Sequence, residues 1–209
     1  MPSKTQKTKF ERTLIVVKHD GVARGLVGEI TSRFERVGLK LVAMEMLSAT
    51  DDMAHQHYPA TQKWFKKVGD RTLDEYNVKG IDPIKKLGTK DSVKIGKMIK
   101  AWNVEYLMSG PVVAMVWEGP NAVIIGRKLV GETVPAMATP GTIRGDFSWD
   151  SADLANKYKR PFYNLVHASG EPEEAEEEIE LWFDPSEILD YKTKIHERMG
   201  MYGKLTKKK

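Results

Sequence analysis

The sequence predicts an α/β fold of the α+β type, a ferredoxin-like βαββαβ sandwich in which a four-stranded antiparallel sheet is covered by helices on one face. Apolar, β-branched runs at 13–17 and 112–117 have the composition of buried strands. Apolar residues at helical spacing follow these runs, at 27–37 and 122–129. The predicted order is strand, helix, strand, strand, helix, strand, helix, and its first six elements match the split βαβ arrangement.

The first half of the chain supplies the first three elements. The run 13–17 predicts a buried strand, and the residues 18–21 that follow it predict a turn. The apolar stripe over 27–37 predicts a helix that stops at Gly38. The imperfect alternation of apolar and polar residues over 39–47 predicts the second strand.

A long segment of mixed character separates the second and third predicted strands. Asp51 is placed to cap a short helix that runs through His55 to Tyr58. Residues 63–103 are too many for a simple loop, so we interpret them as an insertion with helical content over 93–102.

The second half of the chain begins with the run 112–117, whose continuous apolarity predicts a strand buried on both faces. Pro120 is expected at the first position of the next helix, which Gly131 ends. A loop rich in glycine and proline then leads to a last strand at 162–166, and Pro172 opens a final helix.

These elements predict one domain with additions. The domain spans 11–192 and is interrupted by the basic insertion at about 63–103 and by a shorter one at about 150–159. Residues 1–10 predict a flexible basic arm, and residues 193–209 predict a C-terminal extension with a Lys-rich tail.

Charge and composition narrow the class of protein. The net charge of +4 favours polyanionic partners such as nucleotides or nucleic acid. The absence of cysteine excludes disulfides, thiolate nucleophiles and Cys-based metal sites. The N-terminus lacks the apolar region of a secretory signal, and no apolar run approaches the roughly 20 residues that span a bilayer. We therefore expect a cytoplasmic protein with no membrane partner.

Two kinds of phosphate site can be compared in the sequence. Residues 126–133 have the spacing of a P-loop, but Glu132 occupies the lysine position and would repel phosphate, so we reject that motif. Dispersed cations offer another route through Lys18, Arg127 and Arg144, because guanidinium groups bind phosphate oxygens bidentately. Taken singly, a side chain of this kind is more often an ordinary solvated surface charge than a phosphate ligand.

His167 is the candidate nucleophile. It stands where the last predicted strand ends and an acidic helix begins, and a neutral imidazole can accept a phosphoryl group and return it. Glu178 is the candidate orienting acceptor, and Ser169 either caps the helix or hydrogen-bonds the site. The alternative is a structural histidine, as any lone histidine can be. His55 and His57 lie two apart on a predicted helix, face different ways and make a poor metal pair.

The motifs in chain order closely resemble those of the nucleoside diphosphate kinase family, over about residues 11–58 and 104–192. The matching strings are ERT (11–13), Lys18 with DGV (20–22), RGLVGEI (24–30), HY (57–58), SGPVVAMVWEG (109–119), GET (131–133), PGTIRGDF (140–147), NLVHAS (164–169) and LWF (181–183). Each string alone is moderately specific, and their order makes the set very specific.

The resemblance implies transfer of the γ-phosphate of a nucleoside triphosphate, typically ATP, to a nucleoside diphosphate, which maintains the NTP and dNTP pools. It implies a ping-pong route through a phosphohistidine on His167, oriented by Glu178 and Ser169. The implied nucleotide contacts are Lys18, Arg127, Thr133 and Arg144 to the phosphates, Lys18 and Asn164 to the ribose, and Tyr58 to the γ-phosphate, with Phe65 and Val104 at the base. Mg²⁺ would enter with the nucleotide and not in a dedicated protein cage.

The chain departs from the family pattern at a few positions. His19 stands where proline usually follows the lysine, which suggests a looser turn at Lys18. Ala168 and Gly170 change the residues around Ser169, and Gly170 removes a carboxylate. The two insertions precede Val104 and the nucleophile strand.

The resemblance also implies a homo-oligomer, with a hexamer as the first expectation and a tetramer as the alternative, because the Pro135 loop is similar to a family subunit contact. A second hypothesis is a nucleic-acid or partner-binding protein on the same fold. The basic insertion and the Lys tail would bind the partner, and the aromatics of the insertion, Trp64, Phe65, Tyr76 and Trp102, would stack on bases. The enzyme is the favoured hypothesis because the phosphate cations and His167 are all retained.

Overall fold

The computed structural model describes residues 10–198. Its centre is a four-stranded sheet in the order β2-β3-β1-β4, made of β1 (Phe10–Val17), β2 (Lys40–Leu47), β3 (Val112–Pro120) and β4 (Val166–Ala168). All three neighbouring pairs are antiparallel, which confirms the predicted ferredoxin-like sheet. Residues 1–9 of the predicted arm and the tail 207–209 lie outside the described residues.

The two inner strands form the buried centre of the sheet. β1 pairs with β3 from Phe10↔Pro120 to Val17↔Val113, so Phe10 begins a strand and does not belong to the predicted arm. Residues 14–17 of β1 are all fully buried. Because side chains alternate along a strand, two of these four point to each face of the sheet.

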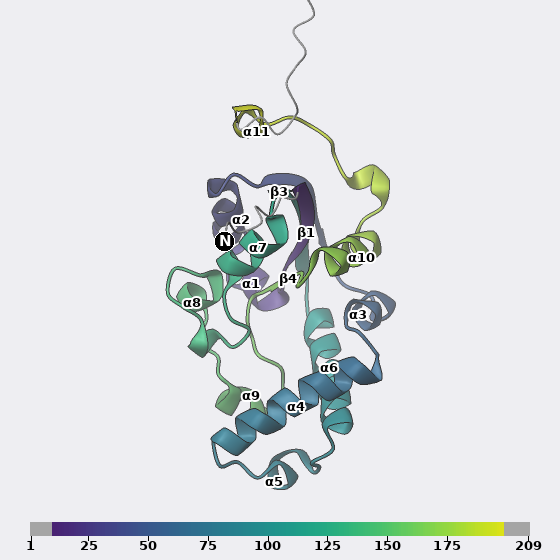
Figure 1. Ribbon diagram of the computed structural model, residues 1–209, viewed down its shortest axis with the longest axis vertical. Coiled ribbons are helices and arrows are strands. Elements are labelled where there is room, and N and C mark those ends of the chain that lie inside the picture. Colours follow the sequence, from purple (N-terminus) through teal and green to yellow (C-terminus); the bar gives the residue numbers. More distant parts are fainter. Residues whose placement is uncertain (1–9, 199–209) are drawn as a thin grey trace, which may run out of the picture.

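Helices cover both faces of the sheet, so the expectation of a single covered face was wrong (Figure 1). One core contains Leu14 and Val16 with side chains from α3 (Asp51–His57), α6 (Ser92–Met108) and α10 (Pro172–Trp182). The other contains Ile15 and Val17 with side chains from α2 (Val27–Arg36) and α7 (Ala122–Val130). The reason is physical: strands without a polar face can be buried only when both faces are covered.

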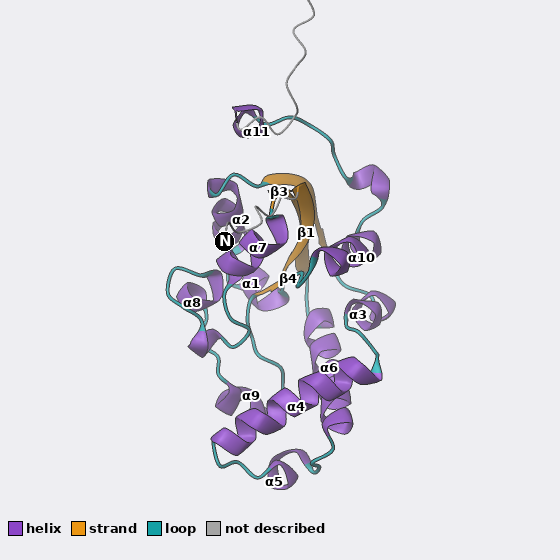
Figure 2. Cartoon of the chain, viewed as in Figure 1, coloured by secondary structure: helices purple, strands orange, loops and turns teal. Residues whose placement is uncertain are grey.

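A helical pair fills the predicted insertion. It consists of α4 (Gln62–Val78) and α6, joined through the short α5 (Pro83–Leu87) (Figure 2). Glycines bring the two long helices into close contact: a Cβ on Gly69 would lie 1.8 Å from the carbonyl oxygen of Ser92, and one on Gly96 would lie 2.1 Å from that of Phe65. The predicted helical content at 93–102 is therefore part of a longer helix, which the Asp91 side chain caps.

Two helix starts differ from the prediction. Thr50, and not Asp51, caps α3, because the Thr50 hydroxyl accepts the backbone N–H of Met53. Pro120 ends β3 opposite Phe10 and does not open a helix. Asn121 then takes a left-handed conformation with a φ of 54°, and α7 starts one residue later.

The last strand is shorter and later than predicted, spanning 166–168 in place of 162–166. The preceding residues bond to side chains and not to a neighbouring strand: the N–H groups of Tyr163, Asn164 and Leu165 donate to Asp150, Tyr106 and Asp20. As a result His167 lies within β4, opposite Val16 of β1.

The remaining elements are short. They are α1 (His19–Ala23), η1 (Pro135–Met137), α8 (Ile143–Phe147), α9 (Ala152–Tyr158), η2 (Pro185–Glu187) and α11 (Lys194–Arg198). The C-terminal segment returns to β2, where the N–H of Leu189 donates to the carbonyl of Val42. Across residues 10–198, none of the helices combines the length and apolarity needed to cross a membrane.

Candidate active site

A cavity of about 350 Å³ opens between one end of the sheet and the α4–α6 pair. Seven of the residues that the sequence pointed to line it: Lys18, Tyr58, Arg127, Thr133, Arg144, Asn164 and His167. Lys18 follows β1, Tyr58 follows α3 and Arg127 lies in the last turn of α7. Thr133 lies in the loop after α7, Arg144 in α8, Asn164 before β4 and His167 within β4. The fold therefore gathers residues up to about 150 positions apart into one site.

His167 is held by a carboxylate directly behind it. Its Nε2 lies 2.8 Å from Oε1 and 3.0 Å from Oε2 of Glu178. The Ser169 hydroxyl donates to the same carboxylate at 2.7 Å and accepts the N–H of Leu14 at 3.1 Å. An imidazole whose Nε2–H donates to a carboxylate keeps its lone pair on Nδ1. The nitrogen available for nucleophilic attack is therefore Nδ1.

Burial keeps this imidazole neutral. Desolvation, reinforced by the nearby charge of Lys18, lowers the pKa of His167 to about 3. Burial also raises the pKa of Glu178 above its ordinary value. An imidazole with so low a pKa stays unprotonated, and hence nucleophilic, at any pH near neutrality.

Three cations converge on the same cavity. Burial and the charge of Arg144 lower the pKa of Lys18 to about 7, and burial and the charge of Arg127 lower that of Arg144 to about 10. The Arg144 guanidinium is fixed by the carbonyls of Gly131, Asn164 and Val166 at 2.8, 3.2 and 2.7 Å. Like charges held together in this way repel, and a bound polyanion would relieve the repulsion.

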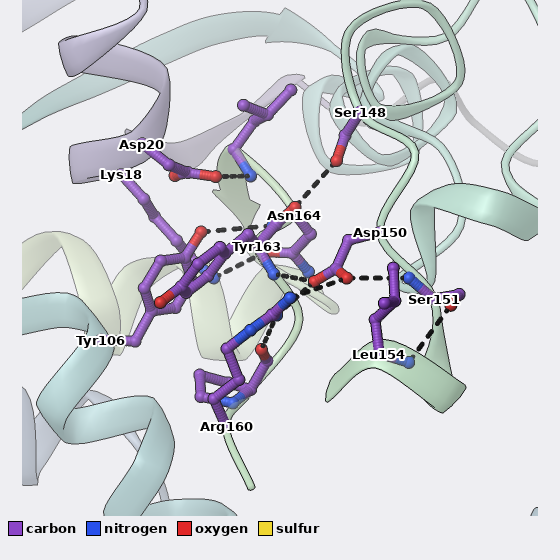
Figure 3. A network of polar contacts seen from close by, with 12 residues as sticks. Lys18, Asp20, Tyr106, Ser148, Asp150, Ser151, Leu154, Arg160, Tyr163 and Asn164 are labelled. Carbon is purple, nitrogen blue, oxygen red and sulfur yellow. Dashed lines mark hydrogen bonds and ion pairs between the residues drawn. The ribbon is translucent and has the colours of Figure 1, made fainter. Parts of the chain in front are cut away.

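Asn164 joins the lysine to the loop after α7. Its Oδ1 accepts from Lys18 Nζ at 2.9 Å (Figure 3), and its Nδ2 donates to the carbonyl of Thr133 at 3.1 Å. The next residue, Leu165, has a φ of 67°, a strained value for a side chain of its size. It is retained because its N–H donates to Asp20 and its carbonyl accepts the N–H of Lys18.

His57 belongs to the site, although no catalytic or binding role was predicted for it. Its ring centre lies 4.3 Å from that of His167, and its Nδ1 accepts the indole N–H of Trp182 at 3.3 Å. Burial lowers its pKa to about 3. His55 is exposed and lies away from this group, as expected from its position on α3. The sequence signal that could have located His57 is that it directly precedes Tyr58, a predicted site residue. In the structure, the buried hydroxyl of Tyr58 has no hydrogen-bond partner among residues 10–198.

The site fits phosphate better than it fits a protein-held metal ion. Among the residues that the structure describes, one group offers clustered metal ligands, His57, His167 and Glu178, with ligand atoms within 4.8 Å of one another. Hydrogen bonds already engage His167 Nε2, the Glu178 carboxylate and His57 Nδ1, and the group contains a single carboxylate. Mg²⁺ prefers several oxygen ligands, whereas the phosphate side of the cavity presents cations.

Two departures from the family pattern have local compensations. A Cβ at Gly170 would lie 2.4 Å from Oε2 of Glu174, which accepts the Gly170 N–H at 2.7 Å. The small residue thus makes room for a carboxylate supplied by α10. The turn after Lys18 is not loosened, because His19 opens α1 and its Nδ1 hydrogen-bonds the Ser109 hydroxyl at 2.9 Å.

Apolar and aromatic side chains also line the cavity. Trp64, Trp102 and Phe162 line it, together with Val68 and Ile99.

Phe65 and Val104, expected at the base, do not line this cavity. Phe65 is buried against α6 at Gly96, and Val104 belongs to the core over the sheet. Successive residues of a helix point about 100° apart, so Trp64 faces the cavity and Phe65 does not. Tyr76 is also fully buried, so the aromatics of the insertion do not form an outer platform for nucleic acid.

Comparisons with known proteins agree with this geometry. A family model described as "Nucleoside diphosphate kinase" matches residues 11–71 and 93–188. A nucleoside diphosphate kinase of Pyrobaculum aerophilum is 52% identical over 86% of this chain and 98% of its own length. The mouse nucleoside diphosphate kinase B is 41% identical over 90% of this chain and 95% of its own length.

Solved structures give the same result. A crystal structure of an NDP kinase from Pyrobaculum aerophilum has a TM-score of 0.84 and 50% identity, covering 87% of this chain and all of that one. A nucleoside-diphosphate kinase from Borrelia burgdorferi, in a transition-state mimic with bound vanadate and ADP, has a TM-score of 0.73 and 35% identity, covering 92% and 98%. Between the two matched segments of the family model lie residues 72–92, within the range 63–103 interpreted as an insertion.

Proposed function

This chain belongs to the nucleoside diphosphate kinase family and is a phosphotransferase of that family, and from this premise we propose that Nδ1 of His167 is the atom that carries the phosphoryl group. The observation that carries the proposal is the convergence of Lys18, Arg127 and Arg144 around a neutral histidine whose other nitrogen is bound by Glu178. Cations aimed at one point, beside a nucleophile with an oriented ring, are what phosphoryl transfer requires.

The reaction runs in two half-steps. The Nδ1 lone pair of His167 attacks the γ-phosphorus of a nucleoside triphosphate, the bond from that phosphorus to the β–γ bridging oxygen breaks, and a nucleoside diphosphate leaves. A terminal phosphate oxygen of a second nucleoside diphosphate then attacks the same phosphorus, and the P–N bond breaks. Glu178 stabilises the positive charge on the phosphorylated ring through Nε2–H.

The other roles follow from the chemistry of each side chain. Arg127, Arg144, Lys18 and Thr133 bind phosphate oxygens, the unpartnered hydroxyl of Tyr58 supports the γ-phosphate, and Asn164 with Lys18 binds the ribose. Ser169 holds Glu178 in place. Mg²⁺ is carried by the nucleotide phosphates, whose charge it neutralises when bound. For the base we propose Trp64 in place of Phe65, with Ile99 and Phe162.

We also propose a homo-oligomer, with a hexamer as the first expectation and a tetramer as the alternative. The support is apolar surface outside the cavity: Met46 is 61% exposed on the edge strand β2, Met137 in η1 is 74% exposed and Trp149 after α8 is 79% exposed. A cytoplasmic location is part of the same proposal. It is supported by nucleotide substrates and by the absence of cysteine.

The relay through His167 can be tested by isotope transfer. The protein is incubated with γ-labelled ATP, separated from nucleotide, and then given GDP. We expect label on the wild type that is acid-labile and base-stable and that passes to GDP. His167→Ala should take up none, whereas His55→Ala, an exposed histidine on α3, should behave as the wild type. Equal labelling of the two variants would refute the role of His167.

A further inference from the structure

We propose that Asp150 is a positioning residue for this reaction, which with Arg160 fixes Asn164 so that its amide meets the ribose hydroxyls of the nucleotide. The inference rests on the proposed function, because it takes the ribose contact of Asn164 from there. It assigns a role to the second insertion, at about 150–159, which begins at Asp150 and ends immediately before Arg160.

Asp150 is a fully engaged, buried carboxylate. Its Oδ2 accepts from Arg160 Nη1 at 2.5 Å and from the N–H of Tyr163 at 2.7 Å, and its Oδ1 accepts from Arg160 Nη2 at 3.1 Å and from the N–H of Ser151 at 3.0 Å. Only 5% of the residue is exposed. A bidentate guanidinium–carboxylate pair of this kind sets a direction as well as a distance.

Asp150 holds two segments beside Asn164, one through its carboxylate and one through its backbone carbonyl. Its bond to the N–H of Tyr163 fixes the residue immediately before Asn164. The backbone carbonyl of Asp150 accepts the N–H of Ala136, which anchors the loop that presents the Thr133 carbonyl to the Asn164 amide. The residue before Asn164 and the loop that carries the Thr133 carbonyl are therefore both tied to Asp150, whereas the other partner of the amide is Lys18.

An aromatic pair links the two cations of this network. The Arg160 guanidinium lies 4.1 Å from the centre of the Tyr163 ring, and the Tyr163 and Tyr106 ring centres lie 5.2 Å apart. Lys18 Nζ lies 4.7 Å from the centre of the Tyr106 ring. Figure 3 shows these side chains converging on Asn164, which accepts from Lys18. Arg160 also lines the cavity, so the network reaches the nucleotide site itself.

A merely structural role makes a different prediction. A buried ion pair that only stabilised the fold would, when broken, reduce activity by the same factor with every acceptor nucleotide. A pair that positions Asn164 would reduce activity only with acceptors that carry the ribose hydroxyls, because the lost hydrogen bonds exist only with those acceptors.

The test measures kcat/KM of the phosphorylated enzyme for ADP and for 2′,3′-dideoxy-ADP. We expect kcat/KM for ADP, divided by kcat/KM for 2′,3′-dideoxy-ADP, to fall by about tenfold in Asp150→Asn and in Asn164→Ala. A fall of this size corresponds to the loss of roughly one net hydrogen bond. In the double variant the ratio should fall no further than in Asn164→Ala alone. Asp153→Asn, at an exposed aspartate of the same insertion that pairs with Lys79, should leave the ratio unchanged.

Arg160→Lys serves as the second variant, because it keeps the charge but loses the bidentate geometry, and the ratio should fall in it too. An unchanged ratio in Asp150→Asn or, if that variant does not fold, in Arg160→Lys would overturn the proposal. If the ratio were unchanged in Asn164→Ala while His167 still took up label, the proposed ribose contact would be refuted. Phosphoryl transfer through His167 would remain supported. A wild type that took up no label would refute the proposed function instead.

Discussion

Three buried residues in or beside this cavity, His167, His57 and Lys18, have pKa values far from their ordinary ones, and burial is the largest cause for each of them. His167 and His57 are shifted to about 3 and Lys18 to about 7. These shifts suit the chemistry, because the nucleophile must be neutral and Lys18 regains its full charge when phosphate arrives. The charge state of the site therefore depends on whether nucleotide is bound.

The low pKa of His167 can be observed directly. We expect its ring signals in a ¹⁵N NMR titration to stay at their neutral positions from pH 8 down to pH 5, because protonation begins only as the pH approaches 3. Lys18→Met removes one of the cations that depress this pKa, so protonation should begin at higher pH in that variant. A titration midpoint near 6.5 in the wild type would contradict the prediction.

Lys18 should make nucleotide binding proton-linked. Its pKa of about 7 leaves most of the ammonium deprotonated at pH 8 in the free enzyme, and nearby phosphate charge raises that pKa again. Binding of ADP at pH 8 should therefore take up protons, and affinity should weaken as the pH rises above 7. Calorimetry in buffers of different ionisation enthalpy measures this uptake.

The control for that experiment is a neighbouring lysine. Lys128→Met changes an exposed lysine in the last turn of α7 and should preserve the uptake, whereas Lys18→Met should abolish it. The same apparent enthalpy in all buffers for the wild type would rule out the linkage.

At the scale of elements, the site depends on the α4–α6 pair, which supplies one wall of the cavity. Lys100 of α6 also reaches across to the end of α3, where its Nζ donates to the carbonyls of His55 and Tyr58 at 2.8 and 2.7 Å. Those carbonyls lie at the C-terminal end of a helix, where a cation is favourable. Displacement of α6 would therefore move Tyr58 as well as Ile99, which we propose contacts the base.

Gly69→Ala should separate the two helices. Its new Cβ would meet the backbone of Ser92, which cannot move aside as a side chain can, and overpacking of this kind costs roughly 1–3 kcal/mol. We expect a lower Tm and a higher KM for nucleotides. Gly28→Ala in α2 is the matched control: among residues 10–198, nothing beyond its chain neighbours and the nearby backbone of its own helix lies within 4 Å of the new Cβ, so helix propensity should make it neutral or stabilising. Equal Tm values for the two variants would contradict close packing at Gly69.

At the scale of the whole molecule, one edge of the sheet is left with exposed apolar side chains. The C-terminal segment bonds to Val42 in β2, but the following residues Met44, Glu45 and Met46 are exposed. An uncovered edge strand with apolar side chains is a surface that proteins normally pair or protect. We infer that a second copy of the chain covers it.

Met46→Glu should weaken that assembly. A carboxylate buried in a subunit contact without a partner is costly, so light scattering coupled to size-exclusion chromatography should give a smaller mass for the variant than for the wild type. Val78→Glu changes a residue of α4 that is 86% exposed and should leave the mass unchanged. A wild type that elutes as a monomer would refute the proposed oligomer.

The sequence by itself determined the features that depend on neighbouring residues. The spacing of apolar residues located the helix at 27–36 almost to the residue, and the ordered motifs pointed to His167 and to the cations that line the cavity with it. These signals are local, because helical periodicity and turn chemistry act over a few positions. The order of elements was enough to predict the sheet.

Only the tertiary structure decided which distant residues meet. In the folded chain, helices cover both faces of the sheet, His57 lies beside His167, and Trp64 instead of Phe65 faces the cavity. It also held residues 162–165 by side chains, so that β4 begins later than its apolar run suggests. Such outcomes depend on packing between segments far apart in the chain, and local patterns carry little information about it.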